Sequence, residues 1–115
     1  MVNKNELIEC PELSEKFTIL FSSLRIWKDG RVYQIKELVG QEFNLKLYVY
    51  PKDHNPPHFH VRSTNGEIDV SFNLNDGEYM GGEVKNPNDL KKIRYLYERY
   101  RPAILKKWEE FNSKK

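Results

Sequence analysis

The chain has 115 residues, of which 38% are hydrophobic and 31% are charged, and its formal net charge is +2. This length fits one domain over residues 1–115. No run of residues approaches the roughly 20 apolar positions that a membrane-spanning helix requires, and the N-terminus lacks the apolar segment of a signal peptide. The single cysteine excludes an intramolecular disulfide. We therefore expect a cytoplasmic domain that makes no contact with a membrane.

Charge is unevenly distributed along the chain. Residues 51–84 contain two basic and six acidic side chains, whereas residues 85–115 contain ten basic and four acidic ones. A basic segment is typical of a surface that binds nucleic acid or an acidic protein, and it is equally typical of a well-solvated helix. The C-terminal segment therefore predicts an RNA or protein contact, with a solvated helix surface as the plainer alternative.

The N-terminal part of the chain predicts a hairpin. Residues 1–16 are polar and favour a frayed segment or a short helix, and residues 17–27 are rich in aromatic and β-branched side chains, which favours a strand. The dipeptide Asp29-Gly30 separates this run from a second one at residues 32–38. That dipeptide is typical of a type I′ turn, in which both central residues have positive φ.

Residues 43–50 (FNLKLYVY) alternate between apolar and polar positions, as expected for a strand with one buried face. A second hairpin follows, with Asn65-Gly66 as its turn. Because side chains alternate along a strand, this turn predicts three polar cross-strand pairs on one face: Arg62 with Asp69, His60 with Ser71 and His58 with Asn73. Two apolar pairs lie on the opposite face: Val61 with Val70, and Phe59 with Phe72. A slip of one residue would destroy this separation.

The last third of the chain predicts one more strand and a helical region. Residues 78–84 favour a strand that closes the sheet, and Asn88 or Asp89 is expected to cap a helix. Pro102 fits the first turn of a second helix, because in a helix interior it removes a hydrogen bond. We therefore predict an α+β fold. An antiparallel sheet of four or five strands carries two short C-terminal helices, or one kinked helix, packed on one face.

All three histidines lie in one short segment, DHNPPHFHV, at residues 53–61. One interpretation is structural, because Pro56 and Pro57 favour an extended entry into an edge strand, with the histidines on its polar face. A second interpretation is a metal site. Its ligands would be a carboxylate and imidazoles, which suit zinc or another transition metal. The candidate ligands are Asp53, His54, His58 and His60.

The third interpretation is acid/base catalysis on a phosphodiester, without a metal or other cofactor. Histidine titrates near neutral pH, so one histidine can accept a proton while another donates one, and an arginine on the same face can hold the phosphate. The candidate catalytic residues are His54, His58, His60 and Arg62. Tyr48 and Tyr50 are candidates for stacking on bases of a bound substrate. The predicted pairing of Arg62 with Asp69 argues against this interpretation, because it would neutralise the guanidinium.

The string DHNPPHFH, preceded by the alternating strand LYVYPK and followed by the strand from Glu67 to Phe72, resembles the hallmark of a bacterial family known as domain of unknown function 4160. The resemblance covers residues 43–113 and leaves residues 1–42 as an N-terminal elaboration. It implies a small bacterial protein without an established activity. Such proteins are often found on mobile elements or beside a second small uncharacterised protein, an arrangement similar to a toxin–antitoxin pair.

The resemblance and the histidine segment together favour a toxin-like component of a two-gene toxin–antitoxin-type module, acting as a metal-independent ribonuclease. Its partner would be a small protein encoded by a neighbouring gene. The alternative is a non-enzymatic module that binds nucleic acid or protein through its basic C-terminal helices. In that case the histidine segment is architectural or binds a metal ion.

Overall fold

The structure, a computed structural model, describes residues 8–35, 44–50 and 57–113. In chain order these residues form β1 (Ile8–Glu9), α1 (Pro11–Ser22), β2 (Leu24–Ile26), β3 (Val32–Gln34), β4 (Leu45–Val49), β5 (His58–Ser63), β6 (Ile68–Asn73), β7 (Tyr79–Val84) and α2 (Asn88–Ser113). A five-stranded antiparallel sheet has the order β1-β4-β5-β6-β7, and β2 and β3 form a separate two-stranded sheet. The predicted α+β class and antiparallel sheet are therefore confirmed.

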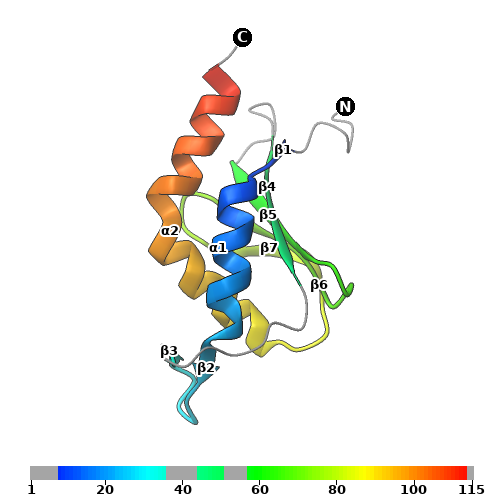
Figure 1. Ribbon diagram of the computed structural model, residues 1–115, viewed down its shortest axis with the longest axis vertical. Helices are drawn as coiled ribbons and strands as arrows, with labels where there is room; N and C mark the ends of the chain where they lie inside the picture. Colours follow the sequence, from blue (N-terminus) through cyan, green and yellow to red (C-terminus); the bar gives the residue numbers. More distant parts are fainter. Residues whose placement is uncertain (1–7, 36–43, 51–56, 114–115) are drawn as a thin grey trace.

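The core lies between one face of the large sheet and the two helices (Figure 1). Alternate side chains of β4, β5 and β6 are fully or almost fully buried on this face: Leu45, Leu47, Val49, Phe59, Val61, Ile68, Val70 and Phe72. The helices contribute a complementary surface, in which the ring of Phe17 from α1 lies 6.0 Å from the ring of Tyr100 from α2. The alternation that predicted the inward face of residues 43–50 is confirmed by the burial of β4.

Helix α1 corrects the strand that was predicted over residues 17–27. Residues 17–22 are helical, and only residues 24–26 of that range form a strand. Pro11 starts the helix, where its missing N–H costs no hydrogen bond. Leu13, Phe17 and Phe21 recur every four residues and are buried, so packing of one helix face against the sheet outweighs the local β-preference of the sequence.

The predicted hairpin in the N-terminal part does form, but its strands are short and its turn differs from the prediction. Ile26 pairs with Val32, and the Trp27 N–H donates to the Arg31 carbonyl at 2.8 Å. Gly30 has φ of +91°, whereas every described non-glycine residue, Asp29 included, has negative φ. A type I′ turn would require positive φ at both positions, so a three-residue loop replaces it.

The hairpin of β5 and β6 has the predicted register. Five Cα pairs match the expectation: His58 with Asn73, Phe59 with Phe72, His60 with Ser71, Val61 with Val70, and Arg62 with Asp69. The turn is again not type I′, because only Gly66 has positive φ and the Gly66 N–H donates to the Ser63 carbonyl at 3.2 Å. A turn with a different backbone path thus preserves the same pairing.

The C-terminal region is one helix of 26 residues with Pro102 inside it, which corrects the prediction of two short helices and agrees with its alternative. The axis of α2 bends near its middle (Figure 1). Proline has no backbone N–H, so the Glu98 carbonyl receives no hydrogen bond from residue 102. Both residues are exposed, so water can donate to this carbonyl instead. Neither described helix has the length and apolar character that crossing a membrane requires.

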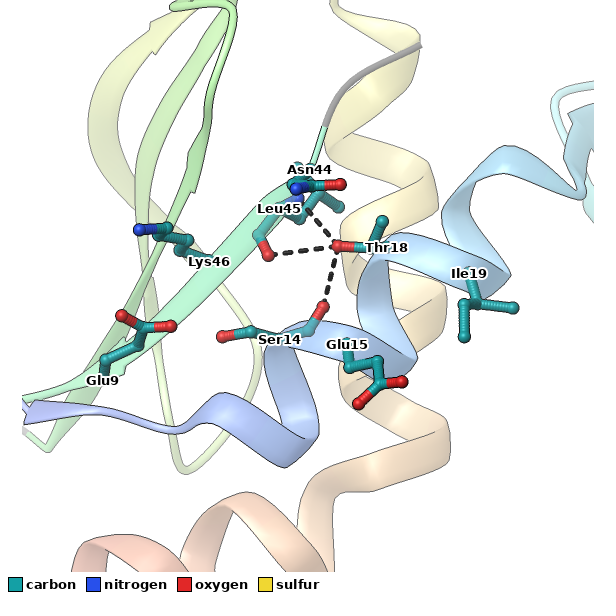
Figure 2. Close-up of a pocket in the computed structure, with 8 residues that line it drawn as sticks. All are labelled: Glu9, Ser14, Glu15, Thr18, Ile19, Asn44, Leu45 and Lys46. Carbon is teal, nitrogen blue, oxygen red and sulfur yellow. Dashed lines mark hydrogen bonds between the residues drawn. The ribbon is translucent and has the colours of Figure 1, made fainter. Parts of the chain in front are cut away.

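Two hydroxyl groups of α1 accept hydrogen bonds from backbone N–H groups of β4, at residues that do not pair with β1. The Thr18 hydroxyl accepts from the Leu45 N–H at 2.8 Å and lies 2.8 Å from the Ser14 carbonyl (Figure 2). The Ser14 hydroxyl accepts from the Leu47 N–H at 2.8 Å. Unpaired N–H and C=O groups at a sheet edge can pair with a strand of another chain and promote aggregation. The helix therefore covers part of this edge.

Replacing Thr18 with Val tests this edge contact. Valine has nearly the same shape and a similar helix propensity, but it leaves the buried Leu45 N–H without its partner. We expect the free energy of unfolding in urea to fall by about 1–3 kcal/mol. The control is Ser22→Ala, because the Ser22 hydroxyl is exposed and donates to the Ile19 carbonyl of its own helix. Equal stability of the two variants would contradict the proposed role of Thr18.

Candidate functional site

The polar face of the large sheet carries the predicted catalytic and stacking residues that the structure describes. His58, His60 and Arg62 alternate along β5 and point away from the core, and Tyr48 of β4 is the cross-strand partner of His60. We call this set, together with Tyr50, Asp69 and Ser71, the histidine face. The predicted site residues Asp53 and His54 lie outside the described residues.

His60 is at the centre of a hydrogen-bonded network on this face. Its Nε2 contacts Oδ1 of Asp69. Ser71 of β6 is the cross-strand partner of His60, and Asp69 lies two residues before Ser71 on the same strand. Its Nδ1 lies 2.8 Å from the Ser71 hydroxyl and 3.1 Å from the Tyr50 hydroxyl. The two hydroxyl oxygens are 3.3 Å apart. Both ring nitrogens of His60 are therefore engaged by side chains.

The contact with Asp69 determines the tautomer of His60. An ionised carboxylate only accepts hydrogen bonds, so the Nε2 of His60 must carry the proton. In the neutral ring, Nδ1 then has a lone pair, which accepts a hydrogen bond from Ser71 or Tyr50. A carboxylate, an imidazole and a hydroxyl in this sequence of contacts are the components of a proton-transfer relay.

Burial keeps His60 in the neutral form. The residue is only 9% exposed, and desolvation lowers the pKa of its imidazole below the ordinary value of 6.5. The hydrogen bond to Asp69 and its negative charge raise the pKa, and the positive charge of Arg62 lowers it, but desolvation is the largest of these effects. At neutral pH His60 is therefore a proton acceptor.

His58 lies beside this network and is also 9% exposed. Its ring is 3.7 Å from the ring of Tyr50, with 38° between the two planes. The Tyr50 ring is 6.2 Å from that of His60, so Tyr50 contacts both histidines of β5. The two histidines thus share an aromatic neighbour.

Arg62 lies at the solvent side of the histidine face, with 47% of its side chain exposed. Its Nε is 3.6 Å from Oδ1 of Asp69, so the cross-strand ion pair expected from the register is confirmed. Its guanidinium carbon is 5.6 Å from the centre of the Tyr48 ring, which places the cation over the aromatic face. Asp69 therefore contacts both His60 and Arg62.

Asp69 and Ser71 were not among the predicted site residues, although the predicted register already placed them opposite Arg62 and His60. The predicted strand pairing could have identified them, had it been combined with the ability of a carboxylate or a hydroxyl to form a hydrogen bond with histidine. A carboxylate two residues from the cross-strand partner of a histidine is within diagonal reach. Gly82 of β7 supports the position of Asp69, because a Cβ at residue 82 would lie 2.1 Å from the Asp69 carbonyl oxygen.

The metal interpretation has no further support from the described residues. In the part of the chain that the structure describes, no three histidine, cysteine, aspartate or glutamate side chains are arranged to hold a metal ion. Two of the four predicted ligands, Asp53 and His54, fall outside that part. The metal site with Asp53, His54, His58 and His60 therefore stays a prediction.

Two surface cavities lie away from the histidine face. One, of about 360 Å³, is open to solvent between α1 and β4, and its lining includes Glu15, Ile19 and Lys46 (Figure 2). The other, of about 220 Å³, lies where β1 meets the end of α2, with Cys10 and Lys107 in its wall. Neither cavity is lined by the histidines or by Arg62, so neither serves as a substrate pocket for the network around His60.

Comparison with known proteins assigns most of the sheet and α2 to a family. Residues 43–109, more than half of the chain, match the family model described as Domain of unknown function (DUF4160). The match contains the histidine segment and leaves α1 and the hairpin of β2 and β3 outside it. No curated protein and no solved structure matches the chain.

The lowered pKa of His60 predicts how stability depends on pH. Below pH 6.5 the unfolded chain takes up a proton at residue 60 before the folded chain does, so the free energy of unfolding falls as pH decreases. The variant His60→Gln keeps an amide that can bond Asp69 and Ser71 but does not titrate. We expect wild type to lose more stability than His60→Gln between about pH 7 and pH 5, measured by urea unfolding. A wild type that loses less stability than the variant would mean that Asp69 outweighs burial.

Proposed function

Since this protein belongs to the family described as Domain of unknown function (DUF4160), we propose its activity from its own side chains: a metal-independent ribonuclease. We further propose that it acts in the cytoplasm as the toxin-like component of a two-gene module, restrained by a small partner protein. The observation that carries the ribonuclease proposal is the contact of Asp69 with His60. That contact prepares Nδ1 of His60 to accept a proton.

The proton reaches His60 through Ser71. His60 is almost fully buried, whereas Ser71 is half-buried and its hydroxyl lies 2.8 Å from Nδ1. The 2′-hydroxyl of an RNA strand gives its proton to the Ser71 oxygen as the Ser71 proton moves to His60. The 2′-oxygen bonds to phosphorus, and the bond from phosphorus to the 5′-oxygen breaks. The products are a 2′,3′-cyclic phosphate and a 5′-hydroxyl.

Two neighbouring residues complete the proposed reaction. His58 is the candidate donor of a proton to the departing 5′-oxygen, and Arg62 binds the phosphate. In the described part of the chain, Arg62 uses Nε for Asp69 and the plane of its guanidinium for Tyr48, and its two Nη groups remain to bind phosphate oxygens. Tyr48 and Tyr50 would stack against bases next to the cleaved bond. His54, outside the described residues, stays a candidate for the same face.

A binding module without catalysis is the second candidate function. The observation that favours it is the low exposure of His58 and His60, 9% each, together with the engagement of both ring nitrogens of His60, because a buried histidine with satisfied ring nitrogens commonly has an architectural role. Exposed basic side chains along α2 would provide the contact surface: Lys91, Arg94, Arg99, Arg101 and Lys106.

RNA cleavage by purified variants tests the ribonuclease proposal. Labelled single-stranded RNA is incubated with each protein in the presence of a chelator, and the cyclic phosphate product is measured. We expect His60→Gln to lower the cleavage rate by about 10²–10⁴-fold, because it cannot accept the proton. Ser71→Ala should also lower the rate, because it removes the hydroxyl between substrate and His60 while Asp69 still holds the ring.

Ser22→Ala is the matched control for Ser71→Ala, because it removes an exposed hydroxyl at the end of α1. Urea unfolding shows whether each variant remains folded. If folded His60→Gln cleaves RNA as fast as wild type, His60 is not the base and the proposed mechanism is wrong. If wild type binds RNA but leaves it intact, the binding module replaces the enzyme.

A further inference from the structure

The hairpin of β2 and β3 has one face made of aromatic and arginine side chains. Arg25 pairs with Tyr33, and Trp27 lies opposite Arg31, to which it is joined by a backbone hydrogen bond of 2.8 Å. Because cross-strand partners share a face and side chains alternate, these four side chains lie on the same side of the hairpin. We call them the hairpin face: Arg25, Trp27, Arg31 and Tyr33.

The opposite side of the hairpin faces the core, which leaves the hairpin face toward solvent. Leu24 is fully buried and Val32 packs against the core, whereas 54% of Trp27 is exposed. The hairpin lies at the end of the molecule away from the C-terminus (Figure 1). A single exposed tryptophan is ordinary, but here it is the centre of an ordered polar and aromatic surface.

The hairpin face is held in position before any ligand binds. The rings of Trp27 and Tyr33 are 4.6 Å apart with 31° between their planes. Nη1 of Arg25 donates to the carbonyls of Ser22 and Leu24 at 3.0 and 2.8 Å. Nε of Arg31 is 2.8 Å from Asp29. Trp27, Tyr33 and Arg25 therefore lose little conformational entropy when a ligand covers them.

The charge around the hairpin face is positive. Arg25, Lys28 and Arg31 outnumber the single carboxylate of the hairpin, Asp29. Lys91 of α2 adds a further cation, because its Nζ lies 3.1 Å from the position that a Cβ on Gly30 would occupy. A ligand that fits this surface has planar groups to stack on the indole and regularly spaced negative charges beside them. Single-stranded nucleic acid has both features.

We propose that the hairpin face binds single-stranded RNA, with one base stacked on Trp27 and adjacent phosphates against Arg31 and Lys91. The choice of RNA among single strands rests on the ribonuclease function proposed above, for which this face supplies a binding element. Duplexes fit poorly, because their bases are already stacked and paired. The hairpin lies outside the matched family region, so Trp27 and Arg31 give this chain contacts that residues 43–109 do not supply, and Lys91 adds a cation from within the matched region.

Binding is tested with a labelled 2′-O-methyl oligouridylate, which cannot be cleaved because its 2′-oxygen is blocked. Affinity is measured by fluorescence anisotropy for wild type, Trp27→Ala, Trp27→Phe and Met80→Ala. We expect Trp27→Ala to weaken binding about tenfold, the loss of one stacked base, and Trp27→Phe to retain most of the affinity. Met80→Ala is the control, because Met80 is an exposed apolar residue on β7, an edge strand of the large sheet and not part of the hairpin. This variant should bind like wild type.

Tryptophan fluorescence gives a second readout, which a purely structural role of Trp27 would not produce. The oligouridylate should quench the emission of wild type but not that of Trp27→Phe, in which half-buried Trp108 is the remaining tryptophan. Equal affinity of folded Trp27→Ala and wild type would overturn the proposal. The proposal would also be overturned if poly-glutamate bound as tightly as the oligouridylate and if that binding depended on Trp27. That result would indicate an acidic protein partner. RNA that binds through Trp27 but is never cleaved supports this proposal and contradicts only the ribonuclease.

Discussion

The antiparallel pairing of β5 with β4 and β6 is the constraint on which both the core and the histidine face depend. Because side chains alternate, one register puts Phe59 and Val61 into the core and places His60 beside Ser71 and Asp69 on the other face. A shift by one residue would expose the phenylalanine and bury the histidine against the helices. Packing of the core therefore determines the geometry of the polar network, although the two lie on opposite faces of the sheet.

Opposing effects act on the pKa of His60, and the larger one determines its protonation state at neutral pH. Desolvation lowers its pKa, whereas the Asp69 carboxylate raises it. Desolvation is the larger effect, so the ring is neutral, and the carboxylate then selects the tautomer with the proton on Nε2. Asp69 can do this while half-exposed because β6 fixes its backbone and Arg62 shares its charge. Burial and tautomer together make Nδ1 an acceptor facing two hydroxyl groups.

The sequence predicted the strand register well and the N-terminal helix poorly, for physical reasons that differ. The register follows from local alternation and a turn between two strands, and it survived even though Asn65 does not adopt the positive φ that was expected. Helix α1 contains Phe17, Thr18 and Ile19, whose local preference is for strands, and contacts with β4 and α2 from distant parts of the chain outweigh that preference. The contact of His60 with Asp69 was within reach of the predicted register, but the burial of His58 and His60 was not, because alternation assigns each side chain to a face and says nothing of its exposure.

The most direct test of the account is the protonation state of the His60 ring. Protein labelled with ¹⁵N in its histidines is examined by a long-range proton–nitrogen correlation spectrum at neutral pH, and His60→Gln assigns the signals. We predict a neutral ring with the proton fixed on Nε2 and a lone pair on Nδ1. A proton on Nδ1, or a doubly protonated ring at pH 7, would contradict it, because His60 could then accept no proton from Ser71.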